Sequence, residues 1–257
     1  MFTKAERIIS VRNLRPKKKE GFLKIISIFS FLGIMLGVAI LIIVMSVMNG
    51  FKTDLTNKIL GLNPHIVIDP NGFKINEEFI QKLKKQFKEI RLSKSYSGEG
   101  IVISKDNAKG VMLKGIDKND ENISKFFDEF FVSGNLKNFE SNNVIIGSEL
   151  AFNLGLEEGD ALNVMSSAFI TTPLGSLPKQ ESFKVAGIFN TGFVEFDKNI
   201  IFLKIEDVLS IFDKNVNDTN IEIYLNNPLK ANSFKNKIQK INPNYFIYTW
   251  TDLNKSL

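Results

Sequence analysis

The chain of 257 residues is 44% hydrophobic and 24% charged, which excludes a disordered protein and leaves one large domain or two small ones. Its formal charge of +5 comes from residues 1–24, which carry eight basic and two acidic side chains, whereas residues 52–257 are close to neutral. This distribution argues against nucleic acid as a partner. The absence of cysteine excludes disulfides and thiolate metal sites.

Residues 25–51 contain no charged side chain and predict a transmembrane helix. As a helix they extend for about 40 Å, more than the roughly 30 Å of a bilayer's hydrocarbon core. A secretory signal peptide is the alternative, but its apolar region is shorter, and the segment SVMNG lacks a small-residue cleavage site. Because Lys and Arg collect on the cytoplasmic side, we expect residues 1–24 in the cytoplasm and the chain after about residue 52 in the periplasm of a bacterium.

The basic leader and the span each contain a feature with two interpretations. Four apolar leader residues fall near one helical face, which favours a helix lying along the inner leaflet, but a solvated basic tail that only sets the orientation explains them equally well. These residues are Phe2, Ala5, Ile8 and Ile9. In the span, Gly33 and Gly37 form a G-x-x-x-G step typical of close helix packing, although glycine is common in membrane helices generally.

Beyond the span the helical spacing of apolar residues continues until Pro64. A strand at 65–69, a helix with Asn76 as N-cap and a strand around 92–96 then form a β-α-β unit. The same order returns near the C-terminus, with elements at 221–225, 228–241 and 245–250. Two such units predict an α+β fold in which one split β-α-β subdomain folds around an insertion. We assign 52–99 and 216–257 to the split subdomain and 100–215 to the insertion.

The insertion is rich in predicted strands, and its long hairpin, residues 166–181, is its most distinctive part. Pro173 and Pro178 lack an amide hydrogen, so we expect the tip to project rather than to lengthen the sheet. Exposed apolar side chains on a rigid projecting loop are typical of a partner-binding surface, but apolar loop residues also fold back onto their own domain. The apolar residues concerned are Phe169, Ile170, Leu174 and Leu177.

Several segments follow one another along the chain in a characteristic order. They are KKKEGF, ISIFSFLGIMLGVAILIIVMSVMNGF, NKILGLNPHIVI, IIGSELAFNLGLEEGD and TTPLGSLP. Together they resemble the lipoprotein-releasing ABC transporter permeases of the LolC/LolE type, over essentially the entire chain. The membrane helix with its NKILG continuation is specific to that group, whereas IIGSELA is shared with permeases of the MacB kind. The resemblance implies a MacB-like periplasmic domain.

The resemblance also implies a function and positions for its sites. The subunit would work in the bacterial inner membrane with a second permease, the same or related, and a cytoplasmic ABC ATPase, and would pass lipoproteins to a soluble periplasmic carrier. The carrier would bind a hook, which matches Pro173, Leu174, Gly175, Ser176, Leu177 and Pro178. Polar or basic residues at the hairpin foot assist in the family, and the corresponding positions here are Asn163, Gln180 and Glu181. The lipid-accessible cavity of the family corresponds to Val44, Met48 and Phe51.

The residues themselves predict neither catalysis nor a metal or cofactor site. His65 is the only histidine and lies beside a strand, which favours a structural role. There is no G-x-x-x-x-G-K-[ST] motif, so ATP hydrolysis is expected on another chain. The polar residues near the strand VIIG are interpreted as helix-start and turn chemistry: Ser148, Glu157, Glu158 and Asp160.

Three points stay open at the level of the sequence. Permeases of this group have three further membrane helices, so we expect a fragment, with Thr251 capping a helix that begins near its end. A related efflux or cell-envelope permease of the MacB/FtsX type, without carrier docking, is the first alternative. The second is a membrane-anchored extracytoplasmic enzyme or sensor, which would need a polar cleft.

Overall fold

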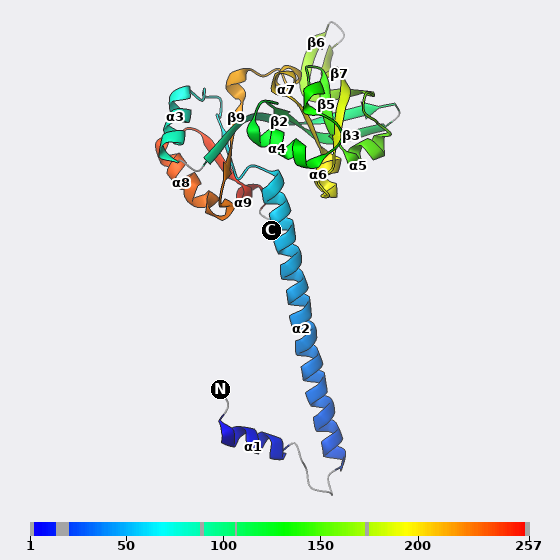
Figure 1. The fold of residues 1–257 in the computed structure, drawn as a ribbon, viewed down its shortest axis with the longest axis vertical. Helices are drawn as coiled ribbons and strands as arrows, with labels where there is room; N and C mark the ends of the chain where they lie inside the picture. Colours follow the sequence, from blue (N-terminus) through cyan, green and yellow to red (C-terminus); the bar gives the residue numbers. More distant parts are fainter. Residues whose placement is uncertain (1–2, 14–20, 88–89, 106, 173–174, 255–257) are drawn as a thin grey trace. The chain divides into compact units, whose positions relative to one another are not determined.

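The computed structural model describes residues 3–13, 21–87, 90–105, 107–172 and 175–254. The chain divides into two compact units, Met1–Asn57 and Lys58–Leu257. Helix α1 (Lys4–Asn13) and most of helix α2 (Gly21–Leu62) belong to the first unit, and the strands belong to the second (Figure 1). The mixture of helices and strands confirms the predicted α+β class.

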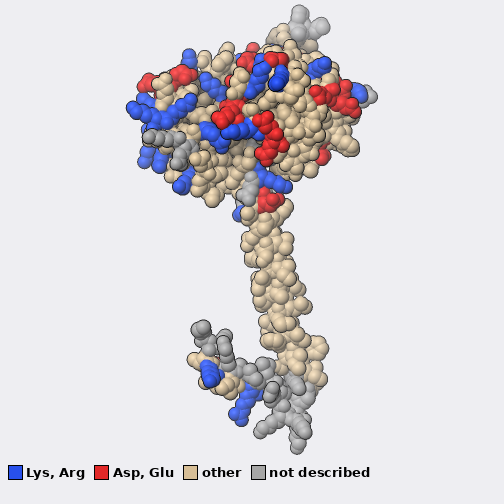
Figure 2. Space-filling model, in the orientation of Figure 1, with Lys and Arg blue, Asp and Glu red and all other residues tan. Residues whose placement is uncertain are grey.

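Helix α2 contains the candidate membrane span. Within the described residues, Ile25–Asp54 is long and apolar enough to cross a bilayer, and Figure 2 shows a long stretch of this helix without charged side chains. A Cβ added at Gly33 or Gly37 would meet no atom within 4 Å, so this chain leaves the small-residue step open to another helix. The helix ends at Leu62, as expected before Pro64, because proline disfavours helical backbone in the residue that precedes it.

Two interlocked β-α-β units form one end of the sheet. Their strands and helices are β1 (Ile66–Asp69), α3 (Glu77–Gln86), β2 (Ile90–Ser104), β9 (Asn220–Leu225), α8 (Ala231–Ile241) and β10 (Phe246–Thr249). The strand order is β10-β1-β9-β2, so each unit places one strand between the two strands of the other. Apolar residues of both helices join one core cluster with alternate residues of these strands, so α3 and α8 cover the same face.

Strand β2 continues from this end of the sheet into the rest of it. Ile90–Ser95 pairs with β9, and Tyr96–Ser104 pairs with β3. The predicted division at residue 99 therefore falls inside one continuous strand. The other elements are β3 (Asn107–Ile116), α4 (Glu121–Phe130), β4 (Phe131–Gly134), η1 (Leu136–Asn138), β5 (Asn143–Gly147), α5 (Ser148–Leu154), β6 (Ala161–Thr172), β7 (Gly175–Phe189), α6 (Val194–Asn199), β8 (Ile200–Lys204), α7 (Ile205–Ile211), η2 (Val216–Asp218), η3 (Pro228–Lys230) and α9 (Trp250–Leu253).

Two apolar clusters hold this second part together. One packs α5 and α7 against β2, β3 and β5 to β8, and the other is rich in phenylalanine. The buried phenylalanines of the second cluster are Phe127, Phe139, Phe189, Phe196 and Phe202. The rings of Phe127, Phe189, Phe196 and Phe202 pack edge to face or tilted, as aromatic pairs prefer.

A buried polar cluster lies where β2 changes partner. The Glu222 carboxylate on β9 accepts hydrogen bonds from Ser95 Oγ (2.7 Å) on β2 and from Tyr224 OH (2.8 Å). Lys114 Nζ on β3 lies 2.9 Å from one oxygen of this carboxylate and 3.1 Å from the other. Glu222 thus binds residues of three neighbouring strands, and its charge is paired, as burial requires. Desolvation, followed by the neighbouring Glu222 charge, raises the pKa of Tyr224.

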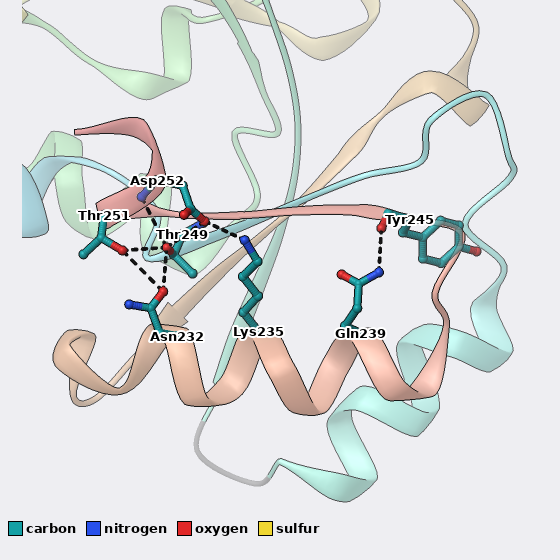
Figure 3. A network of polar contacts seen from close by, with 7 residues as sticks. All are labelled: Asn232, Lys235, Gln239, Tyr245, Thr249, Thr251 and Asp252. Carbon is teal, nitrogen blue, oxygen red and sulfur yellow. Dashed lines mark hydrogen bonds and ion pairs between the residues drawn. The ribbon is translucent and has the colours of Figure 1, made fainter. Parts of the chain in front are cut away.

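A second polar network closes the C-terminal end (Figure 3). Helix α9 is capped by Thr249, not by Thr251 as predicted: Thr249 and Asp252 form a capping box, because Asp252 stands three residues after Thr249. The Thr251 hydroxyl instead lies 2.8 Å from the Thr249 hydroxyl. Lys235 on α8 donates to Asp252 Oδ2 (2.8 Å), and this bond, with the Thr249 amide, lowers the pKa of Asp252 to about 2.

Candidate functional site

The β6–β7 hairpin contains the predicted hook. The two strands pair from Ala161 with Lys184 up to Thr172 with Gly175, with a register shift between Met165 and Phe169. The neighbouring strand β2 pairs with β6 only as far as Ser166. Beyond that point the described hairpin is a two-stranded ribbon, which Figure 1 shows extending past the ends of the other strands.

The expectation that both prolines keep the tip from lengthening the ladder is wrong at Pro178. Strand β7 runs through Pro178, which pairs with Phe169. A proline is tolerated there because β7 is paired on one side only at this point, and the register shift lies next to it. Gly175 begins β7 with φ +124°, a conformation that favours glycine. Pro173 and Leu174 of the predicted hook lie outside the described residues.

The described apolar residues of the ribbon are exposed on both of its faces. Phe169 is 67% exposed, Ile170 49% and Leu177 56%. Cross-strand partners share a face, so Ile170 and Leu177 lie on one side and Phe169 and Pro178 on the other. Ser176 is exposed at the tip end of β7. The side chains that the structure describes do not fold back onto their own domain.

The predicted foot residues divide between the same two faces. In the ladder Asn163 pairs with Ser182, and Gln180 pairs with Met165, which places Asn163 and Gln180 on the Phe169 face. Glu181 lies on the opposite face, 3.4 Å from Lys179 Nζ and within 3.4 Å of the Ser210 hydroxyl. The structure therefore brings Asn163 and Gln180 together on one face and separates Glu181 from them.

An apolar groove of about 610 Å³ opens beside the hairpin root, on the Phe169 face. It is lined mainly by residues of β2, β3, β6 and β7, among them Ile101, Met112, Met165, Phe169 and Pro178. Alternation along a strand puts Met165 on the face opposite the buried Val164, which is the sequence signal for this surface. The groove was not predicted, because it needs the pairing of β2 with β6, which joins two hairpins that are distant in sequence.

The remaining sequence candidates have structural roles. His65 Nδ1 accepts a hydrogen bond from Leu225 N (2.8 Å), so Nε2 carries the proton and donates to Leu60 O (3.1 Å). Burial lowers the pKa of His65, which favours this neutral form. Glu157 N donates to Asp160 in a turn, as predicted. Among the described residues no three His, Cys, Asp or Glu side chains are grouped to hold a metal ion.

The model of the MacB-like periplasmic core domain matches residues 27–241. The chain belongs to this family. This chain is 27% identical over 261 residues to the lipoprotein-releasing system transmembrane protein LolC of Xylella fastidiosa. The match covers 100% of this chain and 63% of that protein. LolC of Neisseria meningitidis is 31% identical over 81% of this chain and 52% of its own length. LolE of Haemophilus influenzae is 28% identical over 87% and 55%.

The predicted resemblance to LolC/LolE-type permeases is thereby confirmed. This MacB-like chain spans less than two thirds of the length of these relatives. Among solved structures, the periplasmic region of MacB from Actinobacillus actinomycetemcomitans superposes with a TM-score of 0.46 at 14% identity, covering 76% of this chain and 92% of that one.

Proposed function

We propose that the chain is the N-terminal part of a permease subunit of an ABC transporter that extracts lipoproteins from the bacterial inner membrane. The transporter comprises a second permease subunit and a cytoplasmic ABC ATPase, which carries out the ATP hydrolysis. The hairpin at residues 166–181 is the docking surface for a soluble periplasmic lipoprotein carrier. Support for the transporter comes from the names of the relatives, three of which belong to lipoprotein-releasing systems.

The observation that carries the docking proposal is the two-stranded ribbon with apolar side chains on both faces. Ile170 and Leu177 on one face, and Phe169 on the other, are apolar side chains that the domain leaves exposed. A β-ribbon orders these side chains before binding, so less conformational entropy is lost on association than for a flexible loop. The surface therefore suits a partner with an apolar groove or cavity, which a carrier of lipid-modified proteins must have.

The charge distribution supports the orientation in the membrane. The basic residues of the leader precede the candidate span, and Lys and Arg are retained on the cytoplasmic side. With the N-terminus in the cytoplasm, the second unit lies in the periplasm, where the carrier is found. Val44, Met48 and Phe51 are exposed on the span and are proposed to face the lipid-accessible cavity of the transporter.

Carrier capture by the full chain in detergent tests the proposal. Leu177→Asp places a charge beside Ile170 on one apolar face of the ribbon, and we expect it to weaken capture by about tenfold or more, as for a central residue of an interface. Leu229→Asp is the matched control, because Leu229 is 74% exposed in η3, far from the hairpin in sequence. Capture by Leu177→Asp as strong as that by Leu229→Asp would refute docking on the hairpin. Absence of capture by the unaltered chain would favour a permease that does not bind the carrier.

A further inference from the structure

The root of the hairpin is held by the C-terminal end of helix α7. Ser166 Oγ on β6 donates to Ile211 O (2.5 Å), and Lys179 Nζ on β7 donates to Ser210 O (2.7 Å). Each strand of the hairpin thus contributes one side chain to the same helix end. We call these two side chains, with the two carbonyl groups that they bind, the root clamp.

The root clamp binds two of the last four carbonyl groups of α7. In an α-helix the last four carbonyl groups have no intrahelical donor. At the end of α7, Val208 O and Leu209 O accept from the amides of Phe212 and Lys214. Ser210 O accepts from both the Asp213 amide and Lys179, whereas the bond recorded for Ile211 O in the described chain comes from Ser166.

Burial strengthens the Ser166 bond of the root clamp, and charge strengthens the Lys179 bond. Ser166 is 5% exposed, and its hydroxyl also accepts from the Ala168 amide (3.2 Å), inside the register shift. The Lys179 side chain is 25% exposed and lies 3.4 Å from Glu181. A cation at the C-terminal end of a helix is favoured by the helix dipole. The Lys179 ammonium is therefore held by a carbonyl, a carboxylate and the dipole together.

The position of the clamp matters because support from neighbouring strands ends there. Ser166 is the last β6 residue paired with β2, and Lys179 follows Pro178, which lies in the first pair beyond the register shift. A two-stranded ribbon is only marginally stable by itself, and a register shift bends and twists the strand that contains it. In the described part of the chain, the clamp holds the hairpin root against the end of α7, with a longer contact between the Ser210 hydroxyl and Glu181 (3.4 Å) beside it.

We propose that Lys179 and Ser166 are positioning residues that fix the direction of the hairpin, so that carrier docking depends on side chains that do not touch the carrier. This inference rests on the docking function proposed above. A ribbon that samples several directions is competent for docking only part of the time, and the apparent affinity falls by that fraction. Loss of one clamp bond is expected to weaken carrier binding by about fivefold, the equivalent of one typical hydrogen bond.

The first measurement needs no carrier. The chain contains no cysteine, so Ser176→Cys and Glu206→Cys allow two spin labels, one on the hairpin and one on α7. We expect Lys179→Met and Ser166→Ala to broaden the distance distribution between the labels. Lys179→Arg, which retains a cationic donor, should keep it narrow, and so should Lys184→Met, which removes an exposed lysine from the same strand.

The second measurement is the affinity of the full chain for the purified carrier, with Trp250 fluorescence confirming that each variant is folded. Lys179→Met should bind about fivefold more weakly, and Lys179→Arg should restore binding. An unchanged distance distribution in Lys179→Met would overturn the clamp, whatever the carrier does. Broadening without loss of affinity would overturn its role in docking. A wild-type chain that binds no carrier, with Lys179→Met still broadened, would refute the proposed function but leave the clamp in place.

Discussion

Removing the Lys114 ammonium should lower the free energy of unfolding strongly, because it breaks a buried ion pair. Lys114 and Glu222 are 12% and 5% exposed in their side chains, and the ammonium group contacts both oxygens of the carboxylate. In Lys114→Met the side chain keeps its apolar stem, but the carboxylate stays buried with only Ser95 and Tyr224 as donors. The loss of unfolding free energy in this variant therefore measures the cost of an uncompensated buried charge rather than of a cavity.

The expected magnitude follows from this geometry. Breaking a buried pair by removing one partner costs about 3–5 kcal/mol, and because two neutral donors remain we expect about 3 kcal/mol of unfolding free energy. Lys125→Met is the control, since its pair with Glu121 has a similar N–O distance (2.6 Å) but is 61% and 79% exposed. This second change should leave the unfolding free energy almost unchanged, because solvent screens an exposed pair of this kind.

Urea unfolding of the full chain in detergent provides the assay. Trp250 is the only tryptophan of the sequence and packs against the apolar core beneath α3 and α8. Its fluorescence therefore reports unfolding of the sheet that contains Glu222. Adding Glu222→Gln to Lys114→Met should recover more than about 1 kcal/mol, because the buried charge is then gone. If Lys114→Met costs no more than Lys125→Met, the reasoning from burial is refuted.

Three further predictions concern single sites. Because burial lowers the pKa of His65, the folded state binds its proton less readily, and stability should fall as pH drops below 6.5; His65→Asn should flatten this dependence in urea unfolding. Asp252 has its pKa lowered to about 2 by Lys235, so Asp252→Asn should destabilise the chain at neutral pH, and the difference should vanish as pH falls through 3.8 towards 2. In membranes, Gly33→Leu should reduce energy transfer between labelled permease subunits, whereas Gly50→Leu, outside the G-x-x-x-G step, should not.

The elements with strong local signals could be predicted from the sequence. The apolar run of α2 and its end before Pro64, the alternating strands β1 and β9, and the amphipathic helices α3 and α8 carry their periodicity in consecutive residues. The order of two β-α-β units then predicted a split arrangement. The effect of the missing amide hydrogen at Pro178 on strand pairing was overestimated. A strand that is paired on one side only tolerates proline, whereas a central strand does not.

The features that depend on pairing between distant segments could not be predicted. The pattern IEIYL predicts Glu222 on a solvent-facing side, and only the placement of Lys114 and Ser95 on neighbouring strands shows that it is buried. Elements α6, β8 and α7 were not assigned individually, and the parallel pairs β3–β8 and β5–β7 have no local signature. The root clamp was missed for the same reason, since Lys179 and Ser210 are 31 residues apart.

Photo-crosslinking in living cells tests the central claim most directly. A photoreactive amino acid is placed at position 177 of the hairpin or, in a second strain, at position 229. The account predicts a crosslink between position 177 and the periplasmic lipoprotein carrier, and none from position 229. Absence of that crosslink in a strain that still releases lipoproteins, or equal crosslinking from both positions, would contradict it.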